Sequence, residues 1–496
     1  MPRDQAPMRS NPPFMLSLNK TPCIYDRGTQ LTVWANNEAQ HGQVPPRDLE
    51  QFSKKRSLSP FFLDYSGHTK LDPFQTYPSP LNAECITRVL TYSIGDMWPK
   101  IFPGMTYKGA SFVDYWIKCA MSCPPLFNAW LHSGAKHMQF LDRPGCDTPR
   151  FTKREKYEIL LMEREAILGL KEAVDYAVPE RILDEHVMAT LALALHPPDR
   201  PRGPAKPARI APLSNLQLLS RFTGINISHV HVNALRHLVS ARGGFDVLEM
   251  PGLKPGLASF DLVVASKSLS RPFWPLRSRL DVNEVQTFLA QVEDTCRALS
   301  KPLLAGLGII IPYTMRCEFN AVRGYSTLLT GYSRGLLGHL MMGYVLELRN
   351  FIHYHVMSLP PPGTMANEGV DLSPTYGALR LGLIAYSLLV LFPVPLTMDP
   401  HPRLSLLLRQ ELECKGVEAD SWFQMPEVLL WLLMLGGISA VGTDHRAWYV
   451  DRIHWLAEVL GVESWEQLRD IMGSILWIDS PCDIEGLILW EEEQLV

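Results

Sequence analysis

The sequence lacks several features that would place it in a specialised class of protein. Its nine cysteines are scattered over 496 residues, whereas disulfide scaffolds have closely spaced, paired cysteines in short secreted chains. The formal net charge is −4, so there is no bulk positive field to attract nucleic acid. The polar, proline-containing beginning has no apolar segment of the secretory type. We therefore expect an intracellular protein with reduced thiols.

Long hydrophobic runs are also missing. Two strongly apolar stretches, 381–394 and 428–441, are shorter than the ~18–20 residues that cross a bilayer. We expect buried core helices at both places and no membrane contact. From the sequence alone, these helices either line a small-molecule cavity or only fill the core.

Cofactor and metal motifs are absent as well. The chain has no Gly-x4-Gly-Lys-Ser/Thr loop, and no Gly-x-Gly-x2-Gly follows a strand. The only short cysteine step, Cys119-x3-Cys123, has no second pair to complete a zinc site. Neighbouring histidines within the two groups are two or six residues apart, which on a helix separates them around the axis; the groups are His229, His231 and His237, and His353 and His355. We expect no cofactor, no metal and no catalytic residue.

What the chain does have is the composition of a globular protein, 46% hydrophobic and 20% charged. Apolar residues recur at helical spacing from about residue 82 onward. The only β-branched run, Ile309–Ile311, is followed at once by Pro312. Seven of the twelve tryptophans lie in the last eighty residues, where helix packing would bury them. These patterns predict an all-α fold, a large single helical bundle-like domain.

Local signals predict where several helices begin and end. One is expected over 154–177 and another from Pro179 through Leu195, because proline fits the first turn of a helix. A third is expected to begin at Ser228 and to stop at Gly243-Gly244. Two further starts carry a capping signal, an acceptor side chain followed three residues later by Glu or Gln; they are Asp281 with Glu284 and Ser464 with Gln467.

Prolines divide the chain into parts. We expect residues 1–80 to form a flexible, Pro-rich N-terminal arm and residues 81–496 to form the helical domain. Two Pro-rich stretches, 197–212 and 359–374, are expected to be exposed loops within that domain. The arm contains the basic run Lys54-Lys55-Arg56, which we interpret as a weak candidate for a nuclear-import signal.

One nominal enzyme motif is present. The segment Gly331-Tyr332-Ser333-Arg334-Gly335 fits the Gly-x-Ser-x-Gly pattern of hydrolases. In those enzymes the serine sits on a strained turn between a strand and a helix. A serine hydrolase acting through Ser333 is therefore an alternative, and it requires a strand entering Gly331 with a histidine and a carboxylate nearby.

A series of short motifs appears in a recognisable order along most of the chain. In order, they are Asp72-Pro73-Phe74 with Pro78; Ala129–Leu141 with His132 and His137; His231, Leu235, Arg242, Gly243 and Gly244; Asp261 and Ala265; Arg271-Pro272-Phe273; and Pro426, Leu430, Trp431, Gly436-Gly437, Arg446 and Trp448. This order resembles the fungal-specific transcription factor domain, the helical regulatory region that follows the binuclear zinc cluster in fungal regulators. The resemblance covers about residues 72–490.

The resemblance implies a nuclear, non-enzymatic transcription regulator or co-regulator that responds to a ligand or a protein partner. It implies partners in the transcription machinery or a zinc-cluster regulator, and a homodimer or heterodimer. The printed sequence departs from the family in one respect, because only Cys23 precedes residue 72 where six cysteines would form the zinc cluster. We therefore expect indirect contact with DNA. A helical scaffold that only binds other proteins is a further alternative.

Overall fold

The computed structural model describes most of the chain after residue 76. The described residues are 77–103, 106–107, 110–141, 151–175, 182–196, 211–214, 216–219, 223, 226–299, 301–338, 340–362, 375–414, 422 and 425–492. All of them belong to one unit, Pro46–Val496. The expected arm, its basic run Lys54-Lys55-Arg56, and most of the two Pro-rich stretches lie outside the described residues.

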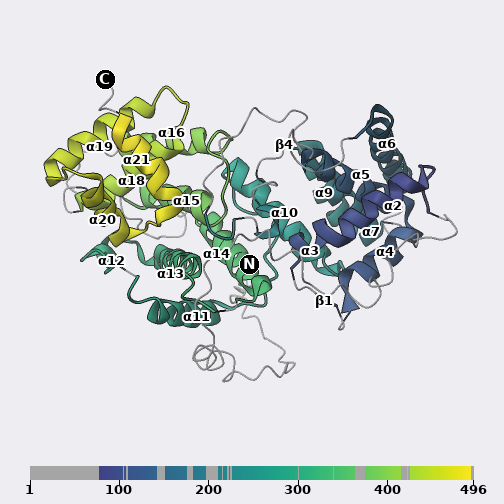
Figure 1. The fold of residues 1–496 in the computed structure, drawn as a ribbon, viewed down its shortest axis with the longest axis horizontal. Helices are drawn as coiled ribbons and strands as arrows, with labels where there is room; N and C mark the ends of the chain where they lie inside the picture. Colours follow the sequence, from purple (N-terminus) through teal and green to yellow (C-terminus); the bar gives the residue numbers. More distant parts are fainter. Residues whose placement is uncertain are drawn as a thin grey trace, which may run out of the picture. The chain divides into compact units, whose positions relative to one another are not determined.

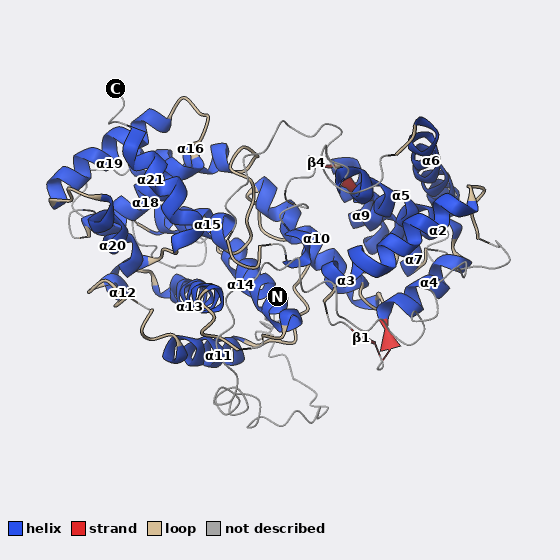
Figure 2. Ribbon diagram, viewed as in Figure 1, coloured by secondary structure: helices blue, strands red, loops and turns tan. Residues whose placement is uncertain are grey.

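The described chain is helical, as the sequence predicts (Figure 2). A first group of helices comprises α2 (Ala83–Tyr92), α3 (Trp98–Ile101), α4 (Phe112–Ser122), α5 (Pro124–Leu141), α6 (Lys153–Asp175), α7 (Asp184–Ala194), α9 (His229–Ala241) and α10 (Leu253–Ser268). A π-helical turn, η3 (Ser93–Met97), joins α2 to α3, and two 3-10 turns follow, η5 (Leu216–Leu218) and η6 (Phe245–Val247).

The rest of the chain forms a second group of helices. It comprises α11 (Val282–Thr295), α12 (Leu307–Ile310), α13 (Arg316–Ser333), α14 (Met342–Ser358), α15 (Tyr376–Val390), α16 (His401–Cys414), α18 (Pro426–Ser439), α19 (Arg446–Leu460), α20 (Trp465–Ile475) and α21 (Ile484–Glu491), with the turns η7 (Tyr313–Met315) and η9 (Asp479–Asp483). In the first group α5 packs on α6 and α7, whereas in the second α15 packs on α16 and α18 (Figure 1). Helix α10 contacts both α7 and α14.

Strands are a minor feature of the described residues. Strand β1 (Thr106–Tyr107) pairs antiparallel with β2 (Ala110–Ser111), and β3 (Leu195–His196) pairs antiparallel with β4 (Asn226–Ile227). Each strand has two residues, so neither pair builds a layer. The β-branched run Ile309–Ile311 contributes to the short helix α12 instead.

The capping signals are confirmed. Ser228 accepts a hydrogen bond from the His231 amide at the start of α9, and Asp281 accepts one from the Glu284 amide at the start of α11. Ser464 and Gln467 form a reciprocal capping box at α20. These signals are reliable because side chains within three residues satisfy the free amides of the first turn. Helix α9 also ends as expected, because Gly243 has a φ of 108° that glycine adopts without steric cost.

The prediction of a helix from Pro179 through Leu195 is wrong at both ends. Ile182 and Leu183 are not helical, α7 begins at Asp184, and Leu195 belongs to β3. Tertiary contacts explain the late start. The buried Asp184 carboxylate pairs with Arg242 Nε at 3.2 Å. It also accepts the backbone amides of Glu249 and Met250, which fixes the first turn of α7 against the segment after α9.

The two apolar stretches are core helices, as expected. Every residue of α15 and nearly every residue of α18 is buried. In the part of the chain that is described, no helix combines the length and the apolar character needed to cross a bilayer. Trp431 on α18 is fully buried and donates its indole N–H to the Leu476 carbonyl at 2.9 Å, which ties α18 to the end of α20.

Gly436 allows α18 and α19 to approach closely. A methyl group added at Gly436 would come within 2.3 Å of the Tyr449 ring. That ring cannot easily yield, because Tyr449 is fully buried and its hydroxyl donates to the Ser405 carbonyl at 2.6 Å.

We therefore expect Gly436→Ala to lower the free energy of unfolding by about 1–3 kcal/mol, the usual cost of overpacking. Urea unfolding followed by circular dichroism measures it. Gly308→Ala is the matched control, since an added methyl at Gly308 meets nothing within 4 Å and alanine favours a helix. An unchanged urea midpoint for Gly436→Ala would contradict this account of the α18–α19 contact.

Candidate functional site

A cavity of about 130 Å³ lies inside the helical body. Its wall is built by α3, α4, α5, α7, η5 and α10, and Phe392, just after α15, lines it from the second group of helices. Most of the lining is apolar; the polar exceptions are Ser133, His137, Gln217 and Ser259. Concave, mainly apolar sites with a few polar groups are typical of small-molecule sites.

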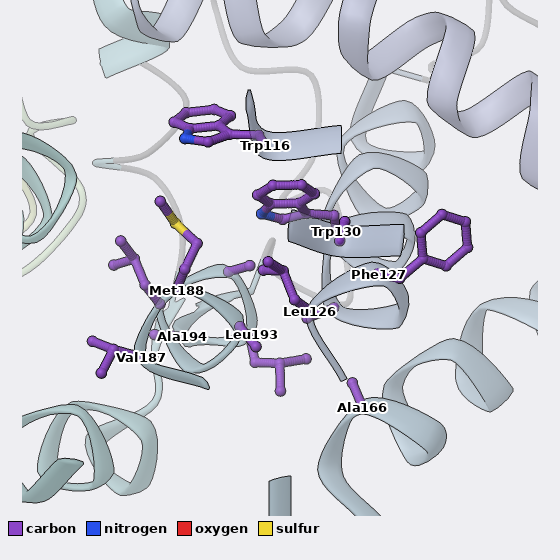
Figure 3. Close-up of a cluster of buried hydrophobic side chains, with 14 of the residues drawn as sticks. Trp116, Leu126, Phe127, Trp130, Ala166, Val187, Met188, Leu193 and Ala194 are labelled. Atoms are coloured by element: carbon purple, nitrogen blue, oxygen red, sulfur yellow. The ribbon is translucent and has the colours of Figure 1, made fainter. Parts of the chain in front are cut away.

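Three indole rings form one wall of the cavity. The ring of Trp98 makes edge contacts with Trp116 and Trp130, with ring centroids 5.6 and 5.0 Å apart. Figure 3 shows Trp116 and Trp130 one above the other, with Met188 of α7 across from them. Trp116 is fixed in place because its indole N–H donates to the Pro251 carbonyl at 2.7 Å.

Local backbone features position this wall. The π-helical turn η3 directly precedes α3 and sets Met97 and Trp98 at the cavity. Turns of this kind occur often at functional sites. Gly134 lets α5 approach η3, because a methyl group there would come within 2.3 Å of Ser93 Oγ. Gly256 of α10 also lines the cavity, and a methyl group there would lie 3.4 Å from Leu191 and 3.9 Å from Phe102.

A buried polar network centred on Arg349 adjoins one end of the cavity. Arg349, on α14, is 1% exposed. Its guanidinium donates to the Leu216 carbonyl at 2.9 Å, to Gln217 Oε1 at 2.8 Å and to Asn350 Oδ1 at 3.0 Å. Asn350 Nδ2 in turn donates to Ser259 Oγ at 3.4 Å. Two of these partners, Gln217 and Ser259, line the cavity.

The charge of Arg349 has no carboxylate partner within the described residues. Its hydrogen-bond acceptors are all neutral oxygens, and the Phe392 ring lies 5.5 Å from the guanidinium carbon. Burial lowers the pKa of Arg349 to about 10, so the group is still cationic at neutral pH. A buried charge without an ionic partner is costly. The neutral oxygens and the ring offset part of that cost.

Backbone strain accompanies this network. Gln217 and Leu218 have φ values of 65° and 55°, a left-handed conformation that residues other than glycine seldom adopt. The contacts of Arg349 with Leu216 and Gln217 hold this turn in place. Strained residues of this kind concentrate at functional sites, and here the strained residue Gln217 lines the cavity.

His353 joins three helices next to the same network. The Ser266 hydroxyl of α10 donates to the Leu262 carbonyl, so it accepts from His353 Nε2 at 2.8 Å. The other ring nitrogen, Nδ1, lies 2.9 Å from Ser387 Oγ of α15. The imidazole also stacks on Phe392 at 4.2 Å. Burial, assisted by the Arg349 charge, lowers the pKa of His353 to about 3.

His137, from the motif Ala129–Leu141, lines the cavity, but the candidate catalytic and metal-binding residues lie elsewhere. Ser333 is the last residue of α13 and is exposed, and its hydroxyl donates to the Thr330 carbonyl at 2.8 Å. No strand enters Gly331, which is itself helical, and no described histidine bonds to Ser333. This placement does not match a nucleophile elbow.

The candidate metal ligands are not gathered together. Within the described residues, no group of three or more His, Cys, Asp or Glu side chains could hold a metal ion. Cys123 is buried between α4 and α5, and burial raises its pKa. Burial also raises the pKa of Cys119, which is only half-buried. Of the grouped histidines, His229 and His237 are exposed on α9.

Sequence reasoning missed most of the residues that form the cavity; the motif Ala129–Leu141, which supplies Trp130, Ser133 and His137, is the exception. It considered the stretches 381–394 and 428–441 as a lining, yet only Phe392 of these stretches lines the cavity. A further signal was the group of tryptophans at 98, 116 and 130, which the C-terminal tryptophans outnumber. No local pattern marks Gln217 or Arg349. When the chain was compared with family models, curated proteins and solved structures, none of them matched it.

The buried histidines predict how stability depends on pH. Burial lowers the pKa of His401 to about 4, as it lowers that of His353 to about 3. In the unfolded chain both imidazoles take up a proton near pH ~6.5. The unfolded state then binds more protons, so the free energy of unfolding falls as pH drops below ~6.5 toward the folded-state values. Each imidazole should remove about 2 kcal/mol between pH 7 and pH 5.

Urea unfolding of the wild type and of His353→Gln at the two pH values measures this effect. The variant should be less stable at pH 7, because it loses one of two buried hydrogen bonds, but should lose about 2 kcal/mol less on acidification. His229→Gln makes the same substitution at an exposed histidine, and it should leave the pH dependence of the free energy of unfolding as it is in the wild type. A His353→Gln dependence equal to that of the wild type would contradict the prediction.

Proposed function

We propose that this chain is a non-enzymatic transcription regulator or co-regulator whose helical body binds a small effector molecule in the aromatic cavity. The observation that carries the proposal is the cavity itself, since its indole wall and its polar end give a mainly apolar molecule a place to bind. The regulatory assignment comes from the ordered motifs that resemble the fungal-specific transcription factor domain.

Contacts among the motif residues support this assignment. Asp261 of α10 is 3% exposed and accepts the backbone amides of Phe273 and Trp274 at 2.5 and 3.0 Å. It thereby ties the Arg-Pro-Phe segment back onto the helix that supplies Phe260 and Val263 to the cavity wall. Arg242, another residue of the motif series, joins the end of α9 to α7 through an ion pair with Asp184. The motif series therefore includes residues that fix two walls of the cavity.

The remaining parts of the proposal concern location and partners. We place the protein in the nucleus, with Lys54-Lys55-Arg56 as its import signal. We assign DNA contact to a partner, a zinc-cluster regulator or another protein of the transcription machinery, in a homomeric or heteromeric assembly.

Localisation and transcript profiling test the regulatory role. The tagged protein should concentrate in the nucleus, and Lys54→Ala/Lys55→Ala/Arg56→Ala should lower the nuclear fraction several-fold. Deletion of the gene should change a defined set of transcripts. The matched control removes three exposed basic residues of α6, Lys153, Arg154 and Lys156, and should leave the localisation unchanged. A protein outside the nucleus, combined with unchanged transcripts after deletion, would refute the regulatory role.

The non-enzymatic part of the proposal has its own test. Because Ser333 ends a helix and is exposed, we expect the purified chain to hydrolyse p-nitrophenyl acetate no faster than the Ser333→Ala variant. Both proteins should also unfold at the same urea concentration, since Ser333 Oγ has only a local contact within α13. A loss of more than about tenfold in the hydrolysis rate on substitution, typical of a nucleophile, would favour the hydrolase alternative.

A further inference from the structure

Hydrogen-bond directions define what the polar end of the cavity offers to a ligand. Arginine has donors only, so Gln217 Oε1 and Asn350 Oδ1 must both face Arg349 as acceptors. The Asn350 amide nitrogen is then a donor, and Ser259 Oγ accepts from it. Gln217 and Ser259 both line the cavity. Gln217 Oε1 already accepts from Arg349 and, at 3.3 Å, from Asn350 Nδ2, so Gln217 offers its Nε2–H donors to a ligand. Ser259 has an O–H to donate, and its oxygen keeps one lone pair, so both residues can donate to the same ligand group.

The positive charge of Arg349 also favours a ligand group that accepts hydrogen bonds. Gln217 Oε1 lies 2.8 Å from a guanidinium nitrogen of Arg349, so the cation polarises the amide and strengthens its N–H as a donor. A hydrogen bond to an ionised acceptor is stronger than one between two neutral groups. The buried Arg349 has no Asp or Glu partner in the described chain, so a bound anion would provide its missing countercharge.

We propose that the cavity binds a small aromatic carboxylic acid as its anion, with the ring against the indole wall and the carboxylate on Gln217 Nε2 and Ser259 Oγ. The proposal rests on the effector-binding part of the proposed function and adds the chemical class of the effector. A cavity of about 130 Å³ is close to the ~150 Å³ apolar cavity that accommodates benzene, so a ligand with one ring fits.

Isothermal titration calorimetry of the purified chain tests the ligand class. The probes are phenylacetate and phenylacetamide, which have the same shape and differ in charge. We expect phenylacetate to bind at least tenfold more tightly than phenylacetamide. Equal affinities for the two probes would overturn the proposed class, as would the absence of binding by phenylacetate at millimolar concentrations.

The variant Gln217→Glu tests the role of the Arg349 charge. It places a carboxylate of the same shape beside the guanidinium, supplies the countercharge from within the protein, and removes the Nε2 donor. We expect phenylacetate affinity to fall at least tenfold, while phenylacetamide affinity changes less than threefold. Because the new ion pair also opposes unfolding, the variant should melt no lower than the wild type. Unchanged phenylacetate affinity in the folded variant would overturn the proposal.

Two further variants keep the test decisive. Gln291→Glu makes the same chemical change at an exposed position of α11 and should bind both probes as the wild type does. Ser259→Ala removes the second donor without adding charge and should weaken phenylacetate binding about threefold to tenfold. It tests the same site if Gln217→Glu fails to fold, and an unchanged affinity would then count against the proposal. Selective binding of phenylacetate, with unchanged transcripts after gene deletion, would support the site and refute the regulatory role.

Discussion

The structure depends on how one buried cation is accommodated. Arg349 lies on α14, in the second group of helices, yet its hydrogen bonds reach the strained turn η5, and through Asn350 they reach Ser259 of α10. Because an arginine removed from water must satisfy its donors within the protein, this requirement selects one arrangement of η5, α10 and α14. Phe392, which packs against both Arg349 and His353, extends the same cluster to the end of α15.

Because of this arrangement, one part of the cavity lining is apolar and another part is polar and lies next to a positive charge. Its indole wall comes from α3, α4 and α5, which belong to the first group of helices, whereas the charge that polarises Gln217 in its lining belongs to α14. Such a lining suits a molecule with an apolar ring and one anionic group, because the ring can pack on the indoles and the anion can accept from the donors next to Arg349. The same charge helps to keep the neighbouring His353 imidazole neutral, so the polar cluster holds a single positive charge at neutral pH.

Several elements were predictable because their causes are local. The N-caps Ser228, Asp281 and Ser464 act on amides within three residues, and the apolar stretches of α15 and α18 specify burial by their composition. The start of α7 was not predictable. The buried carboxylate of Asp184 is held by groups of residues 242, 249 and 250, and these contacts overrule the local preference for an earlier start at Pro179.

The sequence by itself determined the all-helical class, the ends of several helices, and the burial of the two apolar stretches, because propensity, capping and hydrophobic spacing act over a few residues. Only the tertiary structure decided the candidate site. The cavity brings together side chains from Met97 to Phe392, and the network beside it pairs Leu216 and Gln217 with Arg349. No local pattern records these contacts, since packing between distant segments sets the position of a buried charge relative to an apolar wall.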